Sequence, residues 1–180
     1  MPADSSTPAV FLSTFQKLVP THLETPWAEE DGLSTGELDA LLAASPAAEA
    51  IREAGDENGS ENGDENGGDA GGIPIPLSLY EFHRALGNCP DLLETDHFFF
   101  DADELEIRDG FLMFLEDSGE STVWGLPVAD AELPDPLVWR RSTGADAEHG
   151  VWTCEGGTFS EFAMDLLQWT FEEPEDSENA

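Results

Sequence analysis

Four histidines and two cysteines are the side chains of this sequence best suited to proton transfer, nucleophilic attack or metal binding. Their surroundings contain none of the spacings typical of a zinc protease, a zinc deaminase or a serine hydrolase, and the cysteines form no C-x-x-C pair. We therefore predict no catalytic residue, no metal ion and no cofactor. One alternative stays open, because distant residues can converge on a metal: His83, Cys89, His149 and Cys154.

Carboxylates offer a second way to bind a metal ion, because calcium and magnesium prefer oxygen ligands. The run from Asp101 to Glu106 contains four acids, and residues 55–72 combine Asp, Asn and Gly as calcium-binding loops do. We interpret the first run as a solvated segment between a strand and a turn. The second has no register that joins the turn glycine to the acids a calcium loop requires at its first and last positions.

Negative charge dominates the composition. The 180 residues include 40 Asp and Glu against six Lys and Arg, which gives a formal net charge of −34. Such a surface repels nucleic acid and anionic membranes, but it speeds the encounter with a basic protein by long-range attraction that salt weakens. Two explanations stay open: a basic protein partner, or a proteome adapted to a salty cytoplasm.

Three helix starts show a Ser or Thr followed three residues later by Glu, a pairing that satisfies backbone donors at both positions. They are Ser34 with Glu37, Ser78 with Glu81, and Thr158 with Glu161. An earlier apolar stretch from Val10 to Val19 has helical spacing, and we expect Pro20 to end it. Pro46 is expected to begin another helix after Ser45.

The Gly-, Asp- and Asn-rich residues 55–72 have no side chain to bury, so we expect a flexible loop there. We predict one domain, with a helical part at 1–54, this loop at 55–72, a core at 73–171 and a disordered acidic tail at 172–180. The sequence contains neither a run long enough to cross a membrane nor a recognisable signal peptide, which predicts a cytoplasmic protein.

From His97 onward the pattern changes to short, alternating runs typical of strands, separated by Gly, Asp and Pro. Asp117 to Gly119 is expected to turn the second run into the third, with Trp124 on the face that anchors a closing helix at 159–171. The fold class predicted is α+β, with N-terminal helices, a central antiparallel sheet of about four to six strands and a C-terminal helix packed on it. The expected strands are residues 97–100, 110–115, 121–128, 137–141 and 150–155.

The order of short motifs across residues 73–171 is distinctive as a set. Ile75-Pro76 and Tyr80-Glu81-Phe82 precede Leu86-Gly87, and Phe99-Phe100 precedes Glu104-Leu105. The run from Gly110 to Gly119, the run Val123-Trp124-Gly125-Leu126, Asp135-Pro136, Trp152 and the Thr158-Phe159-x-x-Phe162 helix follow. This order resembles the SUKH superfamily, which includes relatives of yeast cell-wall assembly regulators and many bacterial immunity proteins.

The resemblance implies an α+β protein without enzymatic activity, which binds and neutralises a toxin domain of the nuclease or deaminase type. Acids near the ends of the central strands could meet the Lys and Arg residues with which such a toxin holds phosphates. We predict partner contacts at Glu116, Asp117, Glu120, Asp130, Asp135 and Trp139. Two alternatives remain: an adaptor or regulatory scaffold of the same fold with no toxin partner, and an acidic enzyme of a kind that its motifs do not reveal.

A salt series separates the two explanations of the charge. If the acids serve a partner, the protein should be folded at physiological ionic strength, about 0.15 M. If they adapt it to a salty cytoplasm, it should unfold below roughly molar salt, because screening would then be needed to overcome self-repulsion. We expect the first result, measured by thermal unfolding at increasing salt, and near-complete unfolding at low salt would contradict it.

Overall fold

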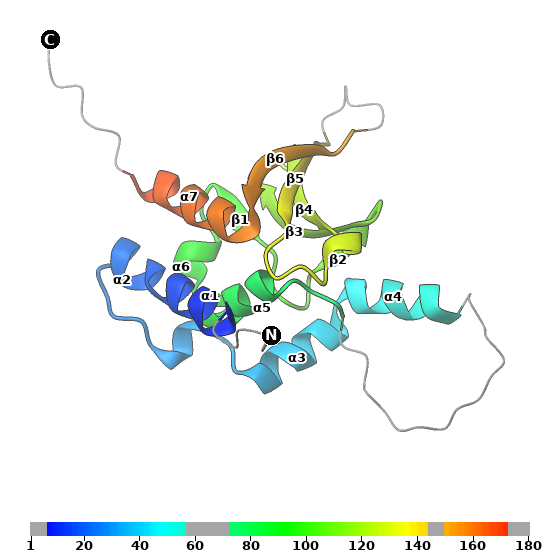
Figure 1. Ribbon diagram of the computed structural model, residues 1–180. Coiled ribbons are helices and arrows are strands. Elements are labelled where there is room, and N and C mark those ends of the chain that lie inside the picture. The colour runs from blue at the N-terminus through cyan, green and yellow to red at the C-terminus, as the bar shows by residue number, and fades with distance from the viewer. Residues whose placement is uncertain (1–6, 57–72, 144–149, 173–180) are drawn as a thin grey trace, which may run out of the picture.

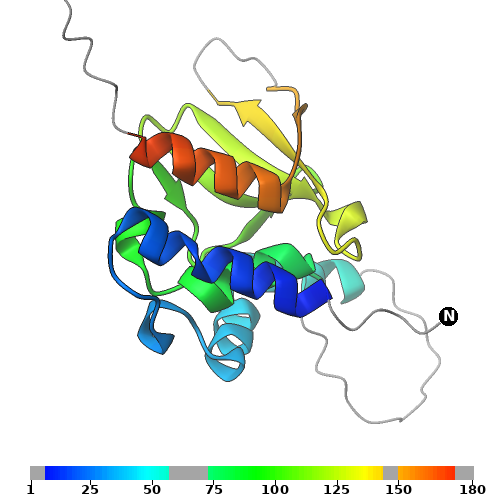
Figure 2. The same ribbon diagram turned by 60° about the vertical axis from the view of Figure 1, so that its left-hand side comes forward.

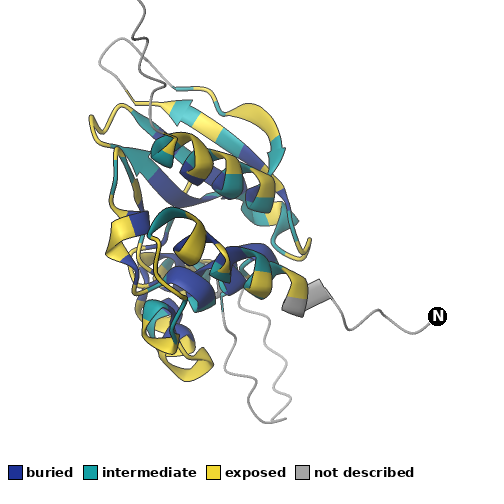
Figure 3. Cartoon of the chain, turned by 90° about the vertical axis from the view of Figure 1, so that its left-hand side faces the viewer, coloured by how far each residue is buried: buried dark blue, intermediate teal, exposed yellow. Residues whose placement is uncertain are grey.

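The computed structural model describes residues 7–56, 73–143 and 150–172. An antiparallel sheet forms one layer and helices from both ends of the chain gather on one side of it (Figure 1), so the predicted α+β class is confirmed. Figure 3 shows the buried residues gathered where helices and sheet face each other. In the described part of the chain no helix is both long and apolar enough to cross a membrane.

The sheet has six strands, and five of them follow the order β1-β3-β4-β5-β6. The predicted strands are present with shifted ends, and each neighbouring pair is antiparallel. The short β2 also pairs with β3 and was not predicted. The strands are β1 (His97–Phe99), β2 (Glu106–Arg108), β3 (Phe111–Asp117), β4 (Thr122–Pro127), β5 (Leu137–Ser142) and β6 (Thr153–Thr158).

The turn between β2 and β3 explains why this extra strand forms. Asp109 and Gly110 make a two-residue connection, with φ angles of 53° and 81°. Positive φ at both positions matches the twist of an antiparallel hairpin, and Asp-Gly is among the pairs that adopt it most readily. The interpretation of Glu106 as part of a solvated turn segment was therefore wrong, since Glu106 begins β2 opposite Met113.

Seven α-helices and two short 3-10 helices accompany the sheet within the described ranges. The α-helices are α1 (Thr7–Gln16), α2 (Leu18–His22), α3 (Thr35–Ala44), α4 (Pro46–Asp56), α5 (Leu77–Leu86), α6 (Pro90–Leu93) and α7 (Phe159–Phe171). The 3-10 helices are η1 (Glu29–Asp31) and η2 (Val128–Asp130). The start of α4 at Pro46 and the capping boxes of Ser34 and Thr158 are as predicted. Residues 57–72 of the expected loop and 173–180 of the expected tail lie outside the described residues.

Two predicted helix boundaries were wrong. Ser78 and Glu81 do not cap α5, because the helix already begins at Leu77 after Pro76, and the Ser78 N–H donates instead to the Pro134 carbonyl at 2.8 Å. Pro20 does not end a helix, because the break falls at Lys17 and Pro20 lies in the first turn of α2. Proline is tolerated there, since the first N–H groups of a helix have no partner within it.

Phenylalanine rings hold the helices to the sheet. The Phe82 ring of α5 lies 5.2 Å from Phe15 of α1, 5.5 Å from Phe159 of α7 and 4.8 Å from Phe99 of β1, measured between ring centroids. The Phe159 ring lies 5.0 Å from Phe114 of β3. Edge-to-face aromatic pairs stabilise beyond the area that they bury. We call these five residues the phenylalanine core.

Residue alternation gives the sheet two different faces. Trp124 and Leu126 point to the helix side, as predicted, and the half-buried Trp124 ring lies 6.2 Å from that of Phe162 in α7. The indole N–H of Trp124 donates to Glu155 at 3.2 Å. Successive positions of a strand face opposite sides of the sheet, so Val123 and Gly125 of β4 lie on the other side, which we call the outer face.

His83 is the most unusual polar group in the core. Its side chain is 1% exposed, and neither ring nitrogen has a hydrogen-bond partner among the described residues. Burial lowers its pKa from 6.5 to about 4, because the charged ring would lose its hydration. The folded protein therefore holds His83 neutral, whereas the unfolded chain takes up a proton as the pH falls below about 6.5.

Replacing His83 should change how stability depends on pH. Because the folded pKa is depressed, the stability contributed by neutral His83 is complete above pH 6.5 and is lost as the pH falls towards about 4. His83→Leu should remove this loss, so its free energy of unfolding should gain about 3 kcal/mol relative to the unmodified protein between neutral pH and about pH 4. Urea unfolding at several pH values measures the difference, and parallel profiles would contradict the assignment.

Candidate protein-binding surface

Three aromatic side chains lie together on the outer face of the sheet. The Phe111 ring of β3 stacks on Trp152, with centroids 4.2 Å apart and planes 18° apart, and it lies 5.9 Å from Trp139 of β5. All three are half-buried, so part of each ring meets solvent. We call Phe111, Trp139 and Trp152 the outer-face aromatic cluster. The described helices gather on the opposite side of the sheet (Figures 1 and 2).

The strand pattern positions this cluster. Gly125 of β4 lies opposite Met113 on one side and Trp139 on the other, so these three positions share the outer face. A side chain at Gly125 would have its first carbon 3.1 Å from the tip of Trp152 and 3.2 Å from the Phe111 side chain. Such contacts are closer than ordinary packing allows, so the rings approach the sheet because residue 125 is glycine.

Glu116 lies on the same face, nearer the β3–β4 turn than the outer-face aromatic cluster. It pairs with Phe98 of β1 on one side and with Val123 of β4 on the other, and Phe98 is 38% exposed. Burial, followed by repulsion from Glu120 and Asp117, raises the pKa of the Glu116 carboxyl. A cation that approached Glu116 would relieve this repulsion, so the position favours a positively charged partner.

The arginines of the outer face already have acidic partners. Arg108, at the end of the face away from Glu116, pairs with Glu106 at 2.9 Å. Arg141 lies in the same cross-strand row as Glu116, with Val123 between them, and its guanidinium pairs with Asp109. These ion pairs cancel local positive charge, whereas Glu116 has no ion pair among the described residues. The outer face therefore combines half-exposed aromatic rings with unbalanced negative charge at the β3–β4 end.

The structure does not bring the five predicted acids together. Glu116, Asp117 and Glu120 lie at the β3–β4 turn, whereas Asp130 in η2 and Asp135 follow the far end of β4. The six residues of β4 separate the two groups by about 20 Å. Of the predicted partner contacts, Glu116 and Trp139 share the outer face.

Two of the predicted acids have structural roles. The Asp117 carboxylate accepts from the N–H groups of Ser121 at 2.7 Å and Thr122 at 3.0 Å, so it holds the turn. Partial burial acts to raise its pKa, but the hydrogen bonds from Ser121 and Thr122 outweigh burial and lower it. Asp135 accepts from the Ser160 N–H at 2.9 Å and from its hydroxyl, which secures the first turn of α7.

The remaining two predicted acids, Glu120 and Asp130, have side chains that are not hydrogen-bonded to other described residues, and only Glu120 lies near Glu116. Glu120 is exposed and adopts a φ of 50°, and its carbonyl accepts from the Thr143 hydroxyl at 2.6 Å. Asp130 is partly exposed, and its side chain makes no hydrogen bond or ion pair with described residues. Glu120 can add to the charge around Glu116, whereas Asp130 cannot because it lies beyond the opposite end of β4.

Phe111 and Trp152 were not among the predicted contacts. The signal that could have found them is the glycine at position 125, flanked by strands that carry large aromatics with the same alternation. Using that signal requires knowing which residues pair across the strands. The β5–β6 pairing shifts by a residue between Leu137 and Trp139, so sequence spacing alone does not give the register.

Metal binding finds no support in the described part of the chain, where no three His, Cys, Asp or Glu side chains are placed to hold an ion. Cys89 is buried, whereas Cys154 is exposed on β6, and His149 lies outside the described residues.

Comparison with protein-family models, with curated proteins and with solved structures found no match. We therefore infer the function from the geometry and charge of the outer face.

The different roles of two acids give a direct test. Asp135→Ala should lower the free energy of unfolding by about 1–2 kcal/mol, because the Ser160 N–H at the start of α7 would lose its acceptor. Asp130→Ala should change it by less than about 0.5 kcal/mol, since that carboxylate contacts no described partner. Urea unfolding of both variants measures the contrast, and equal stabilities would show that Asp135 does not secure α7.

Proposed function

We propose that this protein is a non-enzymatic protein-binding module that neutralises a basic toxin domain of the nuclease or deaminase type by occluding its active site. The outer face of the sheet is the contact surface. Neutralisation inside the cell that makes the toxin places the protein in the cytoplasm. The motif order that resembles the SUKH superfamily, together with the α+β architecture, supports this proposal.

The single observation that carries the proposal is the outer-face aromatic cluster, which shares its face of the sheet with Glu116. Tryptophan and other aromatic residues are enriched among the few side chains that dominate binding energy, and they act best at the centre of an interface, where water is excluded. Trp139 and Trp152 present such rings on the outer face of the sheet, and the Phe111 ring packs against both.

Charge supplies the second part of the argument. A nuclease or deaminase holds its substrate with Lys and Arg residues that contact phosphates. Glu116 and Glu120 can pair with such residues, and the remaining acids of the chain add long-range attraction. Asp117 and Asp135 are left out of this role, because their carboxylates are bonded within the fold.

Surface plasmon resonance against a basic nuclease or deaminase toxin domain, sought first among the genes that neighbour this one, tests the proposal. Trp139→Ala should weaken binding by about 2 kcal/mol or more, roughly 30-fold, mainly through faster dissociation. The matched control is Trp169→Ala, which removes a ring that is 70% exposed on α7 and should leave binding unchanged.

A second pair of variants tests the charge. Glu116→Gln should slow association at low salt about twofold or more, and the effect should shrink at high salt. Asp103→Asn removes one exposed acid elsewhere and serves as the control. Equal effects of Trp139→Ala and Trp169→Ala would remove the outer face from the interface, and failure to bind any neighbouring toxin domain would favour the adaptor instead.

A further inference from the structure

A groove runs between α1 and α7, on the helix side of the sheet and away from the outer-face aromatic cluster. The two helices lie side by side and run in the same direction (Figure 2). The first stretch of the groove has a volume of about 730 Å³, and a second stretch of about 340 Å³ follows it towards α2. Met164 lines both stretches, so we treat them as one feature and call it the helix groove.

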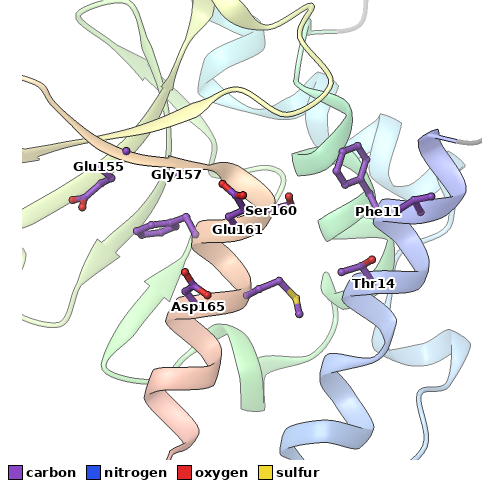
Figure 4. A pocket seen from close by; sticks show the side chains of 11 residues that line it. Phe11, Thr14, Glu155, Gly157, Ser160, Glu161 and Asp165 are labelled. Carbon is purple, nitrogen blue, oxygen red and sulfur yellow. The ribbon is translucent and has the colours of Figure 1, made fainter.

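Apolar side chains line the floor of the first stretch. Phe11 comes from α1 (Figure 4), as does Val10, and Met164 comes from α7. Phe162 of α7 also lines this stretch, but it lies on the other side of that helix and packs on Phe114 and Trp124 of the sheet. Val10 is 56% exposed, and the other three are half-buried. Leu18 and Phe171 extend this floor into the second stretch. An occupant that covered these side chains would remove apolar surface from water, which favours binding.

Every charged residue that lines the first stretch is an acid. Glu155 comes from β6, and Glu161 and Asp165 come from α7. Glu161 is held in place by the Thr158 N–H at 3.1 Å, and Glu155 is partly neutralised by Arg140 at 3.2 Å. Asp165 is exposed and makes no hydrogen bond or ion pair with described residues. The apolar floor is therefore edged by negative charge on its α7 side.

The second stretch differs in charge. It contains Lys17 from the end of α1 and Glu172 from the end of α7. His22 stacks on Phe171 with ring centroids 5.0 Å apart, and burial lowers its pKa, which favours the neutral ring at neutral pH. Positive charges of an occupant are therefore favoured most over the first stretch, where every charged lining residue is an acid.

We propose that the helix groove binds a basic amphipathic helix of a partner protein. The apolar stripe of this helix covers Val10, Phe11 and Met164, and its Lys or Arg residues pair with Asp165. From Ser160 to Glu172 the groove follows 13 residues of α7 and its cap, about 20 Å, which matches about three to four turns of a bound helix. Helix-in-groove recognition uses this arrangement of apolar anchors and flanking charges.

Charge excludes other occupants. The chain's own flanking segments, residues 1–6 and 173–180, contain acids and neither Lys nor Arg, so the acidic rim repels them. A second copy of the chain has the same net charge of −34 and is repelled more strongly. A cationic segment of another protein is the occupant that the rim attracts.

A synthetic peptide of about 13 residues tests the proposal, with Leu at helical spacing and Lys at the other positions. Fluorescence anisotropy should detect binding of this peptide to the full chain, and the same peptide with Glu in place of Lys should not bind. Asp165→Lys should weaken binding about fivefold or more at about 0.05 M salt, and less at about 0.5 M. Asp103→Lys makes the same change of net charge away from the groove and should weaken binding less.

The apolar floor needs its own variant. Val10→Ala removes an exposed anchor without disturbing α1, because alanine favours helix, and it should weaken binding about threefold to tenfold at both salt concentrations. Circular dichroism confirms that each variant is folded. Equal binding of the Lys and Glu peptides, or equal effects of Asp165→Lys and Asp103→Lys, would overturn the proposal.

Trp139→Ala separates this site from the outer face. It should leave peptide affinity unchanged, because Trp139 pairs with Gly125 on the outer face, whereas Trp124 contacts Phe162 of α7 on the opposite face. Loss of toxin binding with intact peptide binding would count for the helix groove as an independent site. A loss of peptide binding in a folded Trp139→Ala variant would count against it.

Discussion

The contact on which the rest of the structure depends is the packing of Phe82 in the phenylalanine core. This ring touches residues from α1, α7 and β1, which are far apart in the sequence, and Phe159 connects the same group to β3. Phe82 and Phe159 are both fully buried. Because one ring meets three elements, the positions of α1 and α7 relative to the sheet are coupled, and so is the groove between them.

This core uses one face of the sheet, and the described helices leave the other face uncovered, although Met113 and Val123 are buried on it. Period-two alternation sends Leu126 and Trp124 towards the helices, and it sends Val123 and Gly125 outward. The glycine then lets Trp152 and Phe111 lie flat against the outer face. The same strand thus secures the core with one set of side chains and shapes a candidate binding surface with the other.

Local signals in the sequence were sufficient wherever the partners are near in the chain. Ser34 and Thr158 cap their helices through a glutamate three residues away, and both were predicted. Ser78 has the same spacing, but its N–H donates to the distant Pro134 carbonyl, and no local pattern reveals that partner. The Asp109-Gly110 pair is a recognisable hairpin signal in the sequence, and it could have been used to predict β2. The helix groove was not, because it joins α1 to α7 only through tertiary packing.

Net charge alone could not locate a site, because many acids are committed within the fold. Asp117 holds a turn and Asp135 secures α7, while Arg108, Arg140 and Arg141 each engage an acid. What distinguishes a binding position is an acid whose charge is not balanced and which lies beside half-exposed apolar surface. Glu116 beside the exposed Phe98 meets both conditions, and so does Asp165 at the rim of the helix groove. The large excess of acids then attracts a basic partner from a distance, and these two places determine where it can be held.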